Sequence, residues 1–172
     1  MLFLAGSMMT AALAQSTWVN AVSANYNRYK TYFLDTAEVM PEADYAYKLT
    51  PAQRPFSAWI GHTAMANYGA CAGMKGEATP AVAKGLDELT KKAEISQALK
   101  DSFAYCDDVF KSMTDQQATM ELKIGERKVV PAVLMVNLVG TLNEHYGNLV
   151  GYMRTKGITP PSTARAQKKN AK

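Results

Sequence analysis

The sequence predicts an all-α protein built as a four-helix bundle. In four long segments the apolar residues recur at steps of three and four, which is the spacing of one helix face. No segment shows a convincing strand alternation, and no internal repeat is present. The length of 172 residues, with 48% hydrophobic and 20% charged residues, is typical of one globular domain. We place this domain at residues 15–161.

The first two helices are predicted on either side of a loop that follows Pro41. The apolar stripe of the first helix consists of Trp18, Val22, Tyr26, Tyr29 and Phe33. Thr50-Pro51-Ala52-Gln53 is a good start signal for the next element, because it combines a capping box with proline at the first helical position. Pro55 then separates this turn from the second helix proper, which runs from Phe56 to about Gly73.

The third helix has the clearest periodicity, and Thr90 is its predicted N-cap. Its apolar positions are Ile95, Leu99, Phe103, Cys106, Phe110 and Met113. A loop around Gly125 precedes the fourth helix, which we expect from about Val130 to Lys156. Gly157 and the Pro160-Pro161 pair end that helix, because glycine adopts the left-handed cap conformation and proline cannot continue the hydrogen-bond ladder.

The two ends of the chain differ from its middle. Residues 1–14 are apolar and end in Ala12-Leu13-Ala14, which is typical of a signal-peptidase site, and the apolar stretch is too short to span a bilayer. No Lys or Arg precedes this stretch, so the alternative is an apolar lead-in to the first helix. We therefore predict a periplasmic or secreted protein, or a cytoplasmic one if residues 1–14 are not a signal.

The net charge of +4 belongs to the C-terminal tail. Residues 162–172 carry four basic side chains and no acidic one, whereas the other 15 basic residues balance the 15 acidic ones. We expect a disordered basic tail there, because the segment has no apolar period. A neutral body predicts no nucleic-acid partner. A small-molecule ligand and a homodimer remain open, and no stable membrane span is expected.

The fourth helix contains the first candidate site residues. It is apolar almost throughout from Val130 to Val150, so most of its surface should be buried. Asn137, Thr141 and His145 nevertheless follow one another at four-residue steps and share one face. Buried polar groups need partners. The pattern fits either a satisfied polar network in the core or a polar cavity beside the second helix.

The second candidate is His62, which lies among large and small uncharged residues on the second helix. His62 and His145 are the two histidines of the chain, and neutral imidazole is the commonest metal ligand. A third ligand would have to be Thr141, Asn137, Glu144 or solvent. Catalytic sites usually have three protein ligands plus water, so the pattern supports a divalent metal only weakly.

Three blocks of the sequence resemble the DinB-like proteins. They are Met40–Cys71 (MPEADYAYKLTPAQRPFSAWIGHTAMANYGAC), Leu99–Phe110 (LKDSFAYCDDVF) and Asn143–Pro161 (NEHYGNLVGYMRTKGITPP). The blocks occur in the expected order and span most of the chain. The resemblance implies an up-down-down-up four-helix bundle that holds a divalent metal, such as zinc or nickel, through three histidines.

The resemblance places two of these histidines at His62 and His145, and the third at position 141. That position is Thr141 here, and threonine is a poor ligand for zinc or nickel beside imidazole. Asn137 and Glu144 are expected next to the site, where they would orient a ligand or a water. The resemblance implies thiol-dependent transfer or isomerisation, or metal-dependent hydrolysis. The departure at Thr141 supports the alternative of a non-catalytic binding or structural module with a degenerate metal site.

The two cysteines, Cys71 and Cys106, are an even set in a chain with a candidate export signal. A disulfide between them is therefore reasonable and would contribute roughly 3–4 kcal/mol on the chain-entropy model. The alternative is two buried free thiols. Their spacing excludes a CxxC redox centre.

Overall fold

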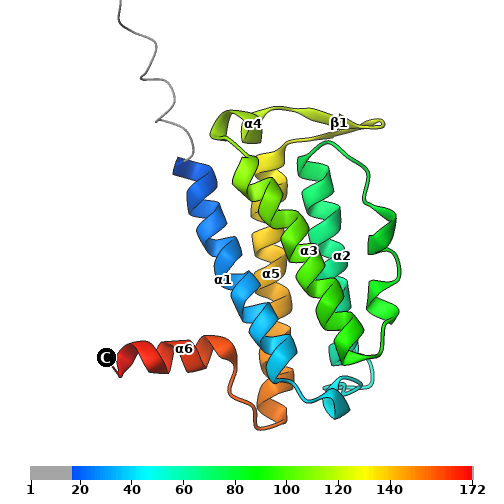
Figure 1. Cartoon of the computed structure of the whole chain (residues 1–172), viewed down its shortest axis with the longest axis vertical. Helices are drawn as coiled ribbons and strands as arrows, with labels where there is room; N and C mark the ends of the chain where they lie inside the picture. Colours follow the sequence, from blue (N-terminus) through cyan, green and yellow to red (C-terminus); the bar gives the residue numbers. More distant parts are fainter. Residues whose placement is uncertain (1–16, 172) are drawn as a thin grey trace, which may run out of the picture.

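A computed structural model describes residues 17–171, and four long helices form its body (Figure 1). They are α1 (Thr17–Val39), α2 (Phe56–Met74), α3 (Lys92–Ser112) and α5 (Pro131–Thr155). Helices α2 and α3 run parallel to each other and antiparallel to α1 and α5. This confirms the up-down-down-up four-helix bundle. The predicted signal segment, residues 1–14, lies outside the described residues.

The core is built from the periodic apolar residues that predicted the helices. Each long helix contributes side chains that are fully or almost fully buried, among them Tyr26, Phe33, Ile60, Ala64, Leu99, Phe103, Leu142 and Leu149. Trp18 belongs to the predicted stripe of α1, but it is 38% exposed near the start of the helix. Tyr26 and Phe33 of that stripe are buried, together with Val19, Thr36 and Ala37.

Helix α2 starts at Phe56, as predicted, but the predicted capping box at Thr50–Gln53 does not form. Thr50–Gln53 forms a turn closed by the Gln53 amide and the Thr50 carbonyl, and no helix begins there. The helix starts at Phe56, after Pro55 as its N-cap. Its first amides are bound by the preceding loop, since Phe56 N donates to Tyr47 O and Ser57 N donates to Tyr45 O. Tertiary contacts thus replace a side-chain cap.

A long connection runs from the end of α2 back along the bundle to the start of α3 (Figure 1). It contains two 3-10 turns, η2 (Ala81–Ala83) and η3 (Leu86–Glu88), besides the short turn η1 (Glu42–Asp44) earlier in the chain. The predicted cap Thr90 is not used: α3 starts one residue later than that prediction requires, with Lys91 at the N-cap and no side-chain cap bond.

Short elements close one end of the bundle between α3 and α5. Helix α4 (Asp115–Thr119) has a complete capping box between Thr114 and Gln117. It is followed by an antiparallel hairpin of β1 (Leu122–Ile124) and β2 (Arg127–Val129), which the sequence did not predict. Gly125 enables the turn because its φ is +59°, a conformation that favours glycine. Three-residue strands are too short to show alternation.

The basic tail is helical rather than disordered. Helix α6 (Pro161–Asn170) projects sideways from the bundle, and Pro161 starts it at the first helical position (Figure 1). It is attached to the bundle through Tyr146 Oη, which accepts from the Ser162 amide at 2.9 Å, and through an Arg165–Asp35 ion pair at 2.6 Å. The prediction of disorder used composition alone, and composition does not reveal the contacts with Tyr146 and Asp35 that hold this helix.

Helix α5 is less buried than its apolar composition suggested. Val133 and Val136 are 55% and 53% exposed, so one side of the helix faces solvent. In the described residues no helix combines the length and apolarity needed to cross a membrane.

Candidate metal centre

The site is positioned by α2, where two of the three glycines, Gly61 and Gly73, allow close packing on either side. A Cβ at Gly61 would overlap the Leu86 carbonyl and lie 2.8 Å from Asp87 Cα. A Cβ at Gly73 would lie 2.9 Å from a methyl carbon of Leu134 on α5. Without these side chains, the η3 turn and helix α5 approach the α2 backbone closely. Gly61 directly precedes His62, so Asp87 is brought near the site.

His62 and His145 face each other between α2 and α5. Their ring centroids are 5.2 Å apart and the ring planes are inclined by 42°. Trp59 lies one turn before His62 and contacts His145 edge-on, with ring centroids also 5.2 Å apart. Two imidazoles that share one metal at about 2.1 Å have centroids about 5 Å apart. The spacing of this histidine pair therefore fits two ligands of one metal.

Thr63 determines which nitrogen of His145 carries the proton. Its hydroxyl donates to the Trp59 carbonyl at 2.9 Å, and the same Oγ1 lies 3.2 Å from His145 Nδ1. A hydroxyl has one hydrogen, so Thr63 Oγ1 accepts from Nδ1–H. His145 Nε2 then has a free lone pair. Metal-binding histidines are commonly oriented by such a bond from their other ring nitrogen.

Both imidazoles favour the neutral form that metal binding requires. Burial and, to a smaller extent, the neighbouring His62 lower the pKa of His145 to about 4. Burial also lowers the pKa of His62, and Arg54 adds to this decrease. Asp87 and Glu144 act in the opposite direction on the pKa of His62. Burial is the largest cause for both residues, so the pair is uncharged at pH 7.

An aromatic and cationic cluster lies beside the histidine pair. The Arg54 guanidinium stacks over the Trp59 ring at 5.4 Å, and the Tyr152 hydroxyl donates to the Arg54 carbonyl. Trp59 Nε1 donates to Tyr152 Oη at 3.2 Å. These bonds hold an exposed cation near two neutral imidazoles. Arg54, Thr63 and Tyr152 were not predicted as site residues, because they become neighbours of the pair only through helix packing.

The other predicted site residues lie on α5 at different depths. Thr141 is half-buried one turn before His145, whereas Asn137 and Glu144 are exposed. The predicted burial of the whole polar file on α5 is therefore wrong, since Asn137 lies on the solvent side. Within residues 17–171, no group of three or more His, Cys, Asp or Glu side chains is arranged to hold a metal ion. Two protein ligands fit a metal here, and Thr141 offers only a hydroxyl.

The buried polar file lies on α2 instead. Thr63, Asn67 and Cys71 follow one another at four-residue steps, and each pairs with another helix. Thr63 contacts His145, and Asn67 Nδ2 donates to Ser102 Oγ at 3.0 Å. Cys71 and Cys106 lie at disulfide-bonding distance, with a Cα–Cα distance of 5.4 Å. This periodicity is visible in the sequence and indicates that Thr63 shares a face with Asn67 and Cys71, but not that it contacts His145.

Together the fold and the histidine pair define a helix-bundle protein with a histidine site between its second and last long helices. The chain belongs to the DinB superfamily, whose sequence model matches residues 26–149. No curated protein matches the sequence.

Several solved structures share the fold. A DinB-like protein from Bacillus cereus is 15% identical with a TM-score of 0.69, and the match covers 83% of this chain and 95% of that one. A DinB-like protein from Bacillus subtilis is 21% identical with a TM-score of 0.63, covering 81% and 94%. A mycothiol-dependent maleylpyruvate isomerase is 16% identical with a TM-score of 0.58, covering 77% of this chain and 59% of that one.

Proposed function

We propose that the chain binds a divalent metal ion, zinc or nickel, through His62 and His145, and acts as a metal-dependent transferase or hydrolase on a thiol-containing or small-molecule substrate. The observation that carries this proposal is the histidine pair: two neutral imidazoles 5.2 Å apart, one of them fixed by Thr63. The thiol-dependent isomerase among the structural neighbours supports the choice of chemistry. A bound divalent metal would supply Lewis acidity that lowers the pKa of a thiol or water.

The residues around the pair have separate tasks in this proposal. Thr63 holds His145 with Nε2 free, and Trp59 covers the ring and limits its contact with water. Arg54 presents a guanidinium beside the pair and would bind a carboxylate or phosphate of the substrate. Thr141 leaves the third position of the site to solvent or to an external ligand.

Metal titration tests this function. Metal-free protein should bind Co²⁺ or Ni²⁺ by calorimetry, and His62→Ala or His145→Ala should weaken binding at least about tenfold. Thr141→His should tighten binding at least about tenfold, because it adds a third imidazole one turn before His145. Asn137→His is the matched control, since it adds a histidine on the exposed side of α5 and should leave the affinity unchanged.

The absence of a three-ligand group among the described residues favours a second candidate, a non-catalytic binding module. It predicts that the wild type binds no metal, while Thr141→His does. Equal metal affinity in the wild type, His62→Ala and His145→Ala would contradict the metal-dependent enzyme.

We also propose that the protein is exported to the periplasm or secreted. The pairing of Cys71 and Cys106 fits an oxidising compartment. Fractionation of cells that express the full chain tests this, together with mass measurement after thiol alkylation with and without reductant. Cytoplasmic protein that takes up two alkyl groups without reductant would contradict export.

A further inference from the structure

The outward face of α5 has the repeat of a helix contact. Five of its exposed residues follow one another at steps of three and four, which is the spacing of a coiled-coil seam. They are Val133, Val136, Gly140, Asn143 and Gly147, and we call them the α5 seam. The buried residues of the same helix pack against α1 and α2. Helix α5 therefore has an inner and an outer contact face, and the bundle uses the inner one.

Large apolar side chains are exposed on and beside the α5 seam. Val133 and Val136 are 55% and 53% exposed, and Trp18 on the adjacent helix α1 is 38% exposed. All three lie in the first two turns of their helices, at the end of the bundle that α4 closes (Figure 1). Six large apolar side chains are exposed in residues 17–171, so half of them lie at this end of α1 and α5. Clustered exposed apolar side chains mark a contact with a partner.

Packing within the chain does not explain the two glycines of the α5 seam. A Cβ at Gly140 or Gly147 would meet no atom of the described residues within 4 Å, whereas a Cβ at Gly61 or Gly73 would collide with a neighbour. Glycine inside a helix costs about 0.5–1 kcal/mol relative to alanine. The glycines of α2 offset that cost by close packing, and those of the seam do not. A helix from another molecule can approach closely where these side chains are absent.

The charge of this surface favours a second copy of the same chain as the partner. Residues 133–147 contain one charged side chain, Glu144, and it is not part of the α5 seam. Residues 18–29 of α1, which packs beside α5, also contain one, Arg28. In the whole chain 20% of the residues are charged. In a two-fold dimer the same surface meets itself, so a surface with few charges avoids like-charge repulsion.

The order of large and small residues in the α5 seam fits a second copy that runs in the opposite direction. Gly140 is the centre of the seam, with Val133 seven residues before it and Gly147 seven residues after it. With a two-fold axis at Gly140, an antiparallel pair places Val133 of each copy opposite Gly147 of the other. Each valine then meets a glycine. A parallel pair would place valine against valine and leave a gap between glycines.

The area of this surface is of the size that a stable dimer needs. Helix α5 has 25 residues and is about 37 Å long at about 1.5 Å per residue. Helices are about 10 Å across, so α5 and the adjacent α1 together offer roughly 700 Å². Stable interfaces bury about 800 Å² per partner. We propose that two copies of this chain form a two-fold dimer in which the α5 seams pack antiparallel and cross at Gly140, independently of the histidine pair.

Sedimentation velocity tests the dimer and its location. At about 100 µM, well above the Kd of a typical stable dimer, the wild type should be dimeric. Gly140→Arg should weaken dimerisation at least about 100-fold, because it places two cations and two long side chains at the axis. The single chain has room for the arginine, so the variant should keep the wild-type circular dichroism spectrum. Ala104→Arg, at an exposed position of α3, is the matched control and should stay dimeric.

Two results of this experiment would overturn the proposal. A wild type that is monomeric at about 100 µM would show that the chain does not pair with itself. A dimer that persists in Gly140→Arg would place the contact on another surface.

Oxidative crosslinking tests the antiparallel orientation. A mixture of Val133→Cys and Gly147→Cys should form a disulfide-linked dimer, because these positions face each other. Val133→Cys alone should not, since the two copies of residue 133 would be about 21 Å apart along the helix axis. Ala104→Cys controls for random collision. A crosslinked dimer of Val133→Cys alone would show a parallel arrangement and overturn the proposed packing.

Discussion

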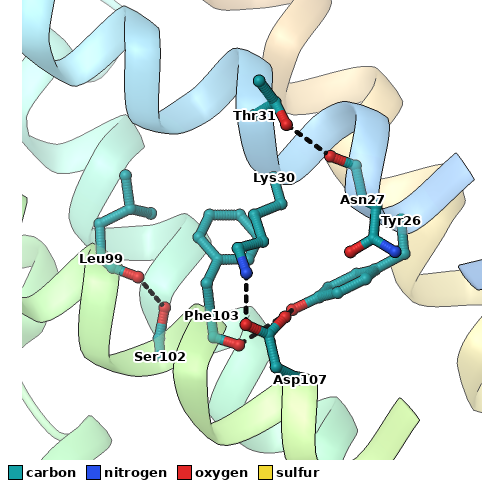
Figure 2. Close-up of polar contacts among 8 residues, drawn as sticks. All are labelled: Tyr26, Asn27, Lys30, Thr31, Leu99, Ser102, Phe103 and Asp107. Carbon is teal, nitrogen blue, oxygen red and sulfur yellow. Dashed lines mark hydrogen bonds and ion pairs between the residues drawn. The ribbon is translucent and has the colours of Figure 1, made fainter. Parts of the chain in front are cut away.

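The α2–α5 interface and the α1–α3 interface hold polar groups between helices in different ways. Along α2, Gly61 and Gly73 bring neighbouring backbones close, and Thr63 pairs with His145. Between α1 and α3, Tyr26 and Lys30 both bond to Asp107 (Figure 2), and the buried Ser23 hydroxyl has no partner. The difference teaches that close packing of α2 gives the His145 ring a defined partner, whereas the edge of the α1–α3 interface leaves one hydroxyl unpaired.

The largest expected effect comes from filling the tight interface. Gly61→Ala should destabilise the fold by about 4–5 kcal/mol, because the added Cβ collides with the η3 backbone, which cannot rotate away. Gly140→Ala is the control, since an added Cβ there meets nothing within 4 Å. It should stabilise the monomer by about 0.5–1 kcal/mol. Urea unfolding of dilute protein measures both, and equal effects would contradict the close packing at Gly61.

The second-largest effect on stability is expected from removing the Cys71–Cys106 pair, which joins α2 to α3. Cys71→Ala/Cys106→Ala should lower the free energy of unfolding by about 3–4 kcal/mol relative to the oxidised protein. Thermal unfolding with and without reductant measures this, and the variant serves as its own control because reductant should not affect it. A reductant-independent wild type would show that the thiols are free.

The buried histidine predicts a pH dependence of stability. The pKa of His145 is about 4 in the folded protein and about 6.5 in the unfolded chain. Between these values the unfolded chain binds the extra proton, so stability is full above pH 6.5 and is lost as the pH falls to 4. The loss attributable to this group is up to about 3 kcal/mol. Urea unfolding in chelator should show it in the wild type.

The His145→Asn variant is the control for that experiment. It keeps every carboxylate of the wild type, so a difference between the two pH profiles reports on His145 alone. Its stability should fall less over the same pH range. Parallel pH profiles for the two proteins would show that His145 is protonated normally in the folded state.

The smallest effects on stability are expected from removing the buried hydroxyls of Thr63 and Ser23. Thr63→Val leaves His145 Nδ1 without an acceptor and should cost about 1–3 kcal/mol. Ser23→Ala removes an unpaired buried hydroxyl and should stabilise the protein by about 1 kcal/mol. Denaturant midpoints distinguish them, and a loss of stability in Ser23→Ala would mean that its hydroxyl is already paired.

Local pattern predicted the helices and the left-handed Gly157 at the end of α5, but two of the N-terminal capping signals were wrong. The stripe from Ile95 to Phe110 placed α3 correctly, since an amphipathic face depends on spacing alone. Thr50–Gln53 forms a turn without a capping box, and loop contacts satisfy the first amides of α2 at its predicted start, Phe56. Thr90 is not the N-cap of α3, because the chain enters that helix through Lys91. The hairpin around Gly125 is too short to produce a periodic signal.

The sequence by itself determined the four long helices and the two histidines, because these follow from residue type and spacing, and its resemblance to the DinB-like proteins indicated the family. The tertiary structure decided which residues accompany the histidines. Thr63, Arg54 and Asp87 surround the pair because glycine-mediated packing brings distant segments together. It also decided that Asn137 faces solvent and that the tail is helical, since exposure and helix anchoring depend on neighbours that are remote in the chain.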